Sequence, residues 1–212
     1  MATWTREAIA DLIEQASWTG RAKLLERLGT RFAEGSLDEA ERQAITDAFR
    51  IALYDAEPLV RRVLAESVKT AADLPRDVLL ALAHDIAAVA APVLEHSQLL
   101  TEDDLLPITL SGSTAHRFAI AARQLISGHI SEVLVKFGER MVIQRLIAND
   151  GATINEMTLH RLLDKFPDVP AIAEGIGRRR LLPVSIGGRL FGSWPRRSAG
   201  ERLIADRTGS LG

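Results

Sequence analysis

Apolar residues recur along this chain at the spacing of one helix face, not at the alternating spacing of a strand. Four such stripes fall within the first 68 residues, each close to the pattern i, i+3, i+4 and i+7. They are Ile9, Leu12, Ile13 and Ala16; Leu24, Leu25, Leu28 and Phe32; Ile45, Ala48, Phe49, Ala52 and Leu53; and Val60, Val63, Leu64 and Val68. No convincing alternating run bounded by turns occurs anywhere in the chain. The pattern therefore predicts an all-α fold.

Helix ends are predicted by capping residues and prolines. Ser36 with Glu39, and Thr153 with Glu156, have capping-box spacing, and Thr101 with Asp104 is a weaker version of it. Prolines are expected in the first turn of three helices, where the missing N–H has no partner in any case: Pro58, Pro75 and Pro170. Short connections join the stripes and favour antiparallel neighbours, and about a dozen helices of ordinary length are expected.

Three segments suggest an internal repeat: "RRVLAES" (Arg61–Ser67), "APVLEHS" (Ala91–Ser97) and "SEVLVKFG" (Ser131–Gly138). Each contains a Val-Leu pair and is followed by a second helical pattern. One pair of helices cannot bury its apolar faces alone, so neighbouring pairs must stack. The repeat predicts an α-solenoid of antiparallel helical pairs. Residues 1–56 would be helices continuous with the array, residues 57–186 the repeats, and residues 187–212 a basic, Gly-rich segment that caps the array or contacts a second copy.

The doublet His84-Asp85 lies in the most apolar part of the chain and has three interpretations. A metal site of the His-Asp type needs a further His upstream, but His84 is the first histidine of the chain. A membrane span is disfavoured because the apolar run barely reaches about 17 residues and Asp at its centre is unfavourable by about 3 kcal/mol. The remaining interpretation is a corner between two helices, with His84 ending one helix and Asp85 capping the next. Pro92 predicts a kink or restart near Ala91.

Charge and composition narrow the class further. The chain has 212 residues, a formal net charge of −2 and no cysteine, which excludes disulfides and thiolate metal sites and suits the cytoplasm. Its N-terminus lacks the continuous apolar region of a signal peptide. From Gly175 onward there are eight Arg against two acids, whereas the preceding residues hold 18 Lys plus Arg against 26 acids. These counts indicate an acidic body followed by a basic C-terminal segment.

Catalytic motifs are sparse. No nucleophile elbow, phosphate-binding glycine loop or dinucleotide fingerprint occurs, and Glu102, Asp103 and Asp104 fit the first turn of a helix better than an acid–base pair. We therefore expect no enzyme, no cofactor and no metal site. The candidate partner-binding residues are the arginines and the tryptophan of the basic segment, which could hold carboxylates or phosphates and anchor in a groove: Arg178, Arg179, Arg180, Trp194, Arg196 and Arg197. The alternative is a solvated helix end with a flexible tail.

Three stretches resemble a known family: "LAHDIAAVAAPVLEHSQLLTEDDLL" (Leu82–Leu106), "HRFAIAARQLISGHISEVLVKFGERMVIQRLIANDGATI" (His116–Ile154) and "GRRRLLP" (Gly177–Pro183). They are similar to an uncharacterised HEAT-like family of alphaproteobacteria, catalogued as a domain of unknown function. The resemblance covers about Leu59 to Pro183, and "VAAPVLEHS" and "ANDGATI" are its most specific parts. It implies a bacterial, cytoplasmic α-solenoid and brings no catalytic residue.

Two functions of different classes follow. A protein-interaction scaffold, binding a partner on the surface of the stacked pairs, fits the repeat and the sparse chemistry. Nucleic-acid binding is the alternative. It would require Arg117, Arg123, Arg140, Arg145 and Arg161 to converge with Arg178–Arg180, and the acidic body disfavours it.

Overall fold

The computed structural model describes residues 16–193, which form twelve helices and no strand. This confirms the predicted all-α fold class. The chain divides into two compact units, a first unit that ends at Ile154 and a second unit that begins at Asn155. The boundaries predicted at residues 56/57 and 186/187 stay predictions, because they mark the limits of the helical repeats and the division at residue 154 separates compact units.

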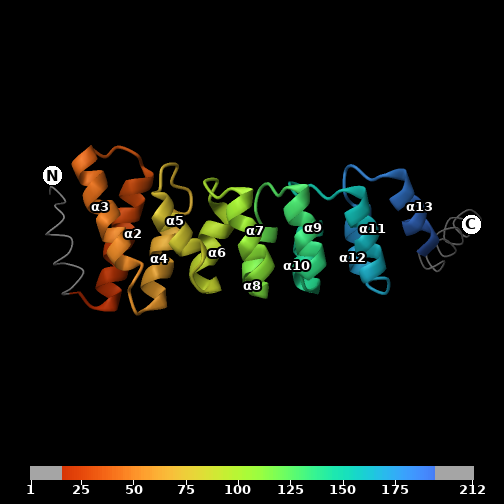
Figure 1. The fold of residues 1–212 in the computed structure, drawn as a ribbon, viewed down its shortest axis with the longest axis horizontal. Helices are drawn as coiled ribbons and strands as arrows, with labels where there is room; N and C mark the ends of the chain where they lie inside the picture. Colours follow the sequence, from red (N-terminus) through yellow and green to blue (C-terminus); the bar gives the residue numbers. More distant parts are fainter. Residues whose placement is uncertain (1–15, 194–212) are drawn as a thin grey trace, which may run out of the picture. The chain divides into compact units, whose positions relative to one another are not determined.

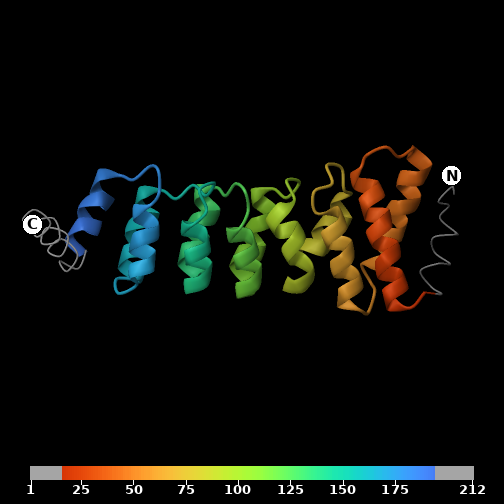
Figure 2. The same ribbon diagram turned by 180° about the vertical axis from the view of Figure 1, so that it is seen from behind.

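The first unit places its even-numbered helices side by side in chain order, with α2 against α4, α4 against α6, α6 against α8 and α8 against α10 (Figures 1 and 2). The odd-numbered helices lie against this row, and α7 and α9 also contact each other. Their bounds are α2 Trp18–Ala33, α3 Glu39–Ala52, α4 Pro58–Val68, α5 Arg76–Ala83, α6 Ala87–His96, α7 Glu102–Ser111, α8 Thr114–Ala121, α9 Gly128–Phe137 and α10 Arg140–Ile147.

The predicted apolar stripes form the interior of the first unit. Phe32 of α2 and Phe49 of α3 are fully buried and meet edge to face, with ring centroids 5.4 Å apart. Leu64 of α4 is also fully buried. Gly29 lets α2 approach α4, because a Cβ there would lie 2.6 Å from the Cβ of Ser67. Hydrophobic burial and one small residue thus set the spacing of the first helices.

The capping predictions are confirmed at one helix and wrong at two. Thr101 and Asp104 form a capping box at the start of α7. Asp38, not Ser36, caps α3, and its carboxylate accepts from the backbone N–H of Glu41. Asn155, not Thr153, caps α11 by accepting from the N–H of Thr158. In both cases the cap lies two positions later, at an Asp as favourable as Ser or an Asn more favourable than Thr.

The prolines and the His84-Asp85 corner follow the predictions in part. Pro58 and Pro170 begin α4 and α12, whereas Pro75 lies one residue before α5. His84 ends α5 as expected. Asp85 is not the cap of α6, a position that Ile86 occupies without a side-chain bond. The helix α6 continues through Pro92, so it does not restart near Ala91, while the alternative of a kink there stays a prediction.

The Val-Leu repeat is in phase for two of its three members. Val63-Leu64 lies on α4 and Val93-Leu94 on α6, and these helices pack together. Val133-Leu134 lies instead on α9, which contacts α7, α8 and α10. Even-numbered and odd-numbered helices both need apolar faces, so a Val-Leu pair does not show to which of the two sets a helix belongs.

The second unit contains α11 (Glu156–Lys165), α12 (Pro170–Gly177) and α13 (Val184–Ser193), and each contacts the other two. Helix α13 forms despite Gly187 and Gly188, because Ile186 and Leu190 are buried. Burial here outweighs the low helix propensity of glycine.

Candidate functional site

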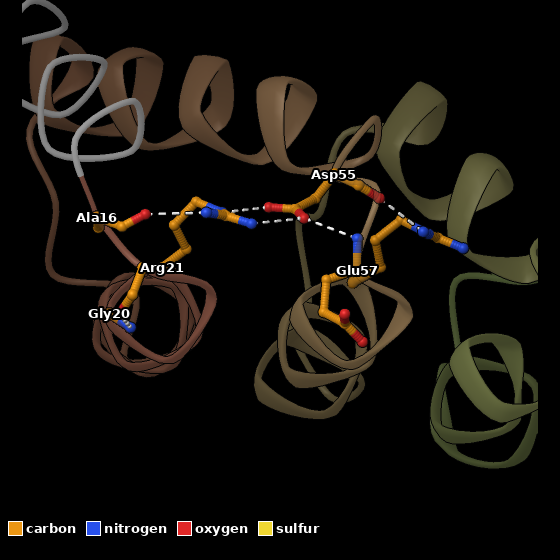
Figure 3. Close-up of polar contacts among 7 residues, drawn as sticks. Ala16, Gly20, Arg21, Asp55 and Glu57 are labelled. Carbon is orange, nitrogen blue, oxygen red and sulfur yellow. Dashed lines mark hydrogen bonds and ion pairs between the residues drawn. The ribbon is translucent and has the colours of Figure 1, made fainter.

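A chain of arginine contacts joins the N-terminal ends of α2, α4, α6 and α8, and we call it the arginine ladder (Arg21, Asp55, Arg61, Asp85 and His116). Figure 3 shows Arg21 of α2 between the carbonyl of Ala16, 2.9 Å away, and the carboxylate of Asp55, 2.6 and 3.0 Å away. Arg61 of α4 repeats the arrangement. It donates to the carbonyl of Asp55 at 2.7 Å and to the carboxylate of Asp85 at 2.6 and 2.9 Å.

The last member of the ladder is a histidine. Nε2 of His116 donates to the carbonyl of Asp85 at 2.9 Å, while its Nδ1 accepts from the backbone N–H of Ser113. Asp85 therefore contacts both neighbouring helices, α4 through its side chain and α8 through its carbonyl. The predicted local corner is in fact a connection between three helices.

Charges within the arginine ladder are neutralised locally. A hydrogen bond from Arg21 is the main cause that lowers the pKa of Asp55, and a hydrogen bond from Arg61 does the same for the pKa of Asp85. The side chains of Arg61 and Asp85 are only 14% and 15% exposed, so the pair is poorly screened by solvent. The doublet His84-Asp85 is not part of a metal cluster, since no group of three or more suitable ligands occurs within residues 16–193. None of the described helices is long and apolar enough to cross a membrane.

An open pocket of about 660 Å³ lies at the opposite ends of α6 and α8, and we call it the connector pocket. It is lined by the end of α6, the start of α7, residues 122–127 between α8 and α9, and Ile130 of α9. Buried apolar side chains form much of its inner lining: Leu100, Leu105, Ile126 and Ile130. Leu125, at its margin, is 76% exposed.

The segment 122–127 is held in place by the "ANDGATI" motif. Nδ2 of Asn149 donates to the carbonyls of Ala121 and Arg123, at 3.1 and 2.6 Å, while its Oδ1 accepts from the N–H of Gly151. The backbone of Ile126 donates to Gly151 and accepts from Thr153. A Cβ at position 151 would lie 1.8 Å from the carbonyl oxygen of Gln124, so only glycine fits there. The motif therefore shapes one wall of the connector pocket.

Arg123 connects this wall to the "VLEHS" end of α6. Its Nη1 and Nη2 donate to the carbonyls of Leu94 and Ser97, at 2.5 and 2.8 Å. These carbonyls belong to the negative end of the helix dipole, where a cation is favourable. The Arg123 side chain is buried, and desolvation lowers the pKa of its guanidinium without removing the charge.

Two glutamates lie at the rim of the connector pocket, each beside a basic residue. Glu102 accepts from Nδ1 of His129 at 2.9 Å. The Ser127 hydroxyl, and after it His129, lower the pKa of Glu102. Glu95 lies 3.8 Å from Nη2 of Arg145. Glu95 thus lies beside a cation and Glu102 is hydrogen-bonded by a histidine, while the pocket combines a partly apolar lining with the cation of Arg123 in its wall.

The second unit brings together a serine, a histidine and acids in a cluster that is not a catalytic triad. Ser185 donates to Glu156 and lies 3.4 Å from Nε2 of His160. Arg189 donates to Nδ1 of His160 at 3.0 Å, so the histidine proton lies on Nε2. Nε2 then has no lone pair with which to accept the Ser185 proton, which a nucleophilic serine requires. The cluster instead joins α11 to α13.

The predicted partner-binding arginines are only partly described. Arg178 ends α12 and lies 3.6 Å from Glu174 of the same helix. Arg179 is half-buried and Arg180 exposed. Trp194, Arg196 and Arg197 lie outside the described residues. Among the body arginines named for nucleic-acid binding, Arg117 donates to the carbonyls of Thr109 and Leu110.

Sequence reasoning missed the connector pocket and the role of Arg123. A signal was available, because the "VAAPVLEHS" and "ANDGATI" segments that best carry the family resemblance both contact the segment 122–127. Their convergence needed the tertiary structure, since Leu94 and Asn149 are far apart in sequence.

Together these features define an all-helical protein with a partly apolar pocket between helix connectors. The chain belongs to the bacterial family described as "Uncharacterised protein conserved in bacteria (DUF2336)", whose sequence profile matches residues 89–208. This confirms the resemblance to an uncharacterised bacterial family, over a range that begins and ends later than the one inferred from the sequence. No curated protein and no solved structure matches the chain.

Proposed function

We propose that this protein is a non-enzymatic interaction scaffold of the bacterial cytoplasm that binds a protein partner at the connector pocket. In this proposal the first unit is an α-solenoid of antiparallel, HEAT-like helical pairs. The succession of even-numbered helices and the arginine ladder support the repeat, because each of its two arginines contacts the loops on both sides.

The connector pocket is the observation that carries the proposal. Its volume of about 660 Å³ is large enough for one or two side chains of a partner, and its lining mixes apolar side chains, such as Leu100, with polar and charged ones, such as Gln98 and Arg123. Leu125 is exposed beside it on a segment fixed from two sides, by Asn149 and by Arg123. A rigid, partly apolar hollow of this kind suits the anchor residue of a protein interface.

Nucleic-acid binding has less support. Arg117 is engaged by the backbone carbonyls of Thr109 and Leu110, and Arg145 lies beside Glu95. Fewer cations are then left to neutralise phosphates, on which nucleic-acid affinity depends.

Site-specific photo-crosslinking tests the proposal. A photoreactive amino acid replaces Leu125 in the full chain, which is produced in a bacterium that has a member of this protein family. In a matched control the same amino acid replaces Lys23, which is exposed on α2. We expect a discrete protein adduct at position 125 and none at position 23. The partner identified by mass spectrometry is then purified, and its affinity for the full chain and for Leu125→Asp is measured. Equal adducts at both positions, or equal affinity of both chains, would contradict the proposal.

A fluorescence-anisotropy titration with duplex DNA at low salt tests the alternative. Binding that weakens steeply with salt, without a protein adduct at position 125, would favour nucleic-acid binding.

A further inference from the structure

Arg123 differs from the arginines of the ladder in having no carboxylate partner within residues 16–193. The residue is only 9% exposed, and its side chain donates to the two carbonyls at the end of α6. Desolvation alone shifts its pKa, with no contribution from a nearby acid. The carbonyls offset part of the charge through the helix dipole, but a buried cation is stabilised fully by an anion.

The guanidinium retains a donor, Nε–H, that no group of the described residues uses. Arginine has five N–H donors, and the bonds to Leu94 and Ser97 use Nη1 and Nη2. The buried side-chain polar atoms without a partner in the described residues are Ser131 Oγ and Thr158 Oγ1. Nε of Arg123 also has no partner, so it is not fully buried, and Arg123 lines the connector pocket.

We propose that the connector pocket recognises a protein segment in which an acidic side chain is adjacent to an apolar one. The carboxylate accepts from the Arg123 guanidinium, while the apolar side chain lies against Leu100, Leu105 and Ile130. This inference rests on the proposed function, because it names the chemistry of the partner at the same pocket.

Charge complementarity favours a single carboxylate over a polyanion. At the rim, Glu95 lies beside the cation of Arg145, and Glu102 accepts a hydrogen bond from His129, so these contacts limit the repulsion of one incoming negative charge. A nucleic acid would bring one charge per phosphate against the same two glutamates and offers little to the apolar lining. A peptide with one acid and flanking leucines satisfies both parts of the pocket.

Two blocked tripeptides that differ by one group provide the test: acetyl-Leu-Asp-Leu-amide and acetyl-Leu-Asn-Leu-amide. Each is titrated into the ¹⁵N-labelled full chain, and the Nε–H signal of Arg123 and the amides of residues 122–130 are followed by NMR. We expect the Asp peptide to shift the Arg123 Nε–H signal and to bind at least about fivefold more tightly than the Asn peptide, since charge-assisted hydrogen bonds are the stronger kind.

Variants separate recognition from folding. Arg123→Gln should abolish the preference for Asp, but it also loses contacts to α6. Glu95→Gln changes a surface residue and removes a negative charge from the rim, so it should tighten binding of the Asp peptide about two- to threefold and leave the Asn peptide unchanged.

The outcomes are distinct from those of the proposed function. Equal affinity of the two peptides, or shifts confined to residues outside the pocket, overturns carboxylate recognition even where crosslinking at position 125 identifies a partner. Tighter binding of acetyl-leucine than of the Asp peptide overturns the choice of an internal protein segment and points to a free carboxylate ligand. Failure of the proposed function is seen separately, as the absence of a specific adduct at position 125.

Discussion

The arginine ladder and the connector pocket lie at opposite ends of α6 and α8, and both place arginines against backbone carbonyls. In the ladder, Arg61 also has a carboxylate, that of Asp85, at hydrogen-bonding distance. In the pocket, Arg123 has only the carbonyls of Leu94 and Ser97 as partners among residues 16–193. An arginine is thus neutralised by an acid at the ladder end of these helices, whereas the arginine at the pocket end has no acid beside it among residues 16–193.

The difference separates structural roles from binding roles. An arginine whose charge is satisfied within the protein holds two helices together and offers little to a partner. An arginine that is buried without an acid is less favourable for folding and gains most from an external anion. This contrast makes Arg123 a stronger candidate for a binding residue than the abundance of arginine near the C-terminus makes the arginines there.

The largest expected effect comes from breaking the pocket end alone. Gly151→Ala places a Cβ 1.8 Å from the carbonyl oxygen of Gln124, so the backbone of one segment must move. We expect a loss of about 3 kcal/mol or more in the free energy of unfolding, measured by urea denaturation. Gly128→Ala is the control, because its nearest contact at 3.7 Å is ordinary and its stability should hardly change. Equal stability of the two variants would show that the wall is not rigid.

Breaking the ladder alone should have the next largest effect. Arg61→Met removes the Arg61 donor from the carbonyl of Asp55 and from the largely buried carboxylate of Asp85, which keeps only the N–H of Ile86. We expect destabilisation of about 2 kcal/mol by thermal or urea unfolding, because a partly buried acid remains without its cation. A double-mutant cycle with Asp85→Asn should recover part of this loss. Additive effects of the two substitutions would contradict direct coupling.

Acid should weaken the ladder end and leave the pocket end less affected. Because Arg61 lowers the pKa of Asp85, the pair contributes fully above the ordinary Asp pKa of about 3.9 and loses its contribution as the pH falls through the lower, folded-state value. We expect the stability difference between wild type and Arg61→Met, about 2 kcal/mol at pH 6, to shrink by about 1 kcal/mol near pH 3. Melting temperatures of both proteins across this range test it. A stability difference that stays constant from pH 6 to pH 3 would show that the Arg61–Asp85 pair does not cause the destabilisation of Arg61→Met.

The smallest expected effect is that of Arg123→Met. The variant loses two hydrogen bonds to carbonyls but also removes a desolvated charge, and these changes oppose each other. We expect destabilisation of about 1 kcal/mol or less, clearly below that of Arg61→Met. Urea unfolding of both variants under the same conditions gives the comparison. A larger loss for Arg123→Met would assign Arg123 a mainly structural role.

Much of the helical structure could be predicted from the sequence, because it depends on local spacing. The stripe with Ile45 and Phe49 is buried, and Thr101 with Asp104 caps α7 as expected. The other two caps were wrong by two residues. Several Ser, Thr, Asp and Asn residues stand near each helix start, and the chain direction there decides which one points at the free N–H groups.

The site could not be predicted to the same degree, because its contacts join residues distant in sequence. Asp85 was interpreted as a local cap, but its carboxylate pairs with Arg61 from the previous even-numbered helix. Arg123 was counted among arginines for nucleic acid, but it is turned to the end of α6. In each case the side-chain type fits both roles, and only the packing of neighbouring helices decides between them.

The sequence separations of these contacts have a consequence for how the protein is made. Arg21 and Asp55 are 34 residues apart, Arg61 and Asp85 are 24, and Asn149 and Arg123 are 26. A ribosome releases the chain from the N-terminus, so each contact can form soon after the next few dozen residues emerge. The ladder can then assemble in order during translation, whereas the pocket waits until Asn149 and Gly151 have left the exit tunnel. A chain stalled before Asn149 would have its ladder and lack the finished wall of its pocket.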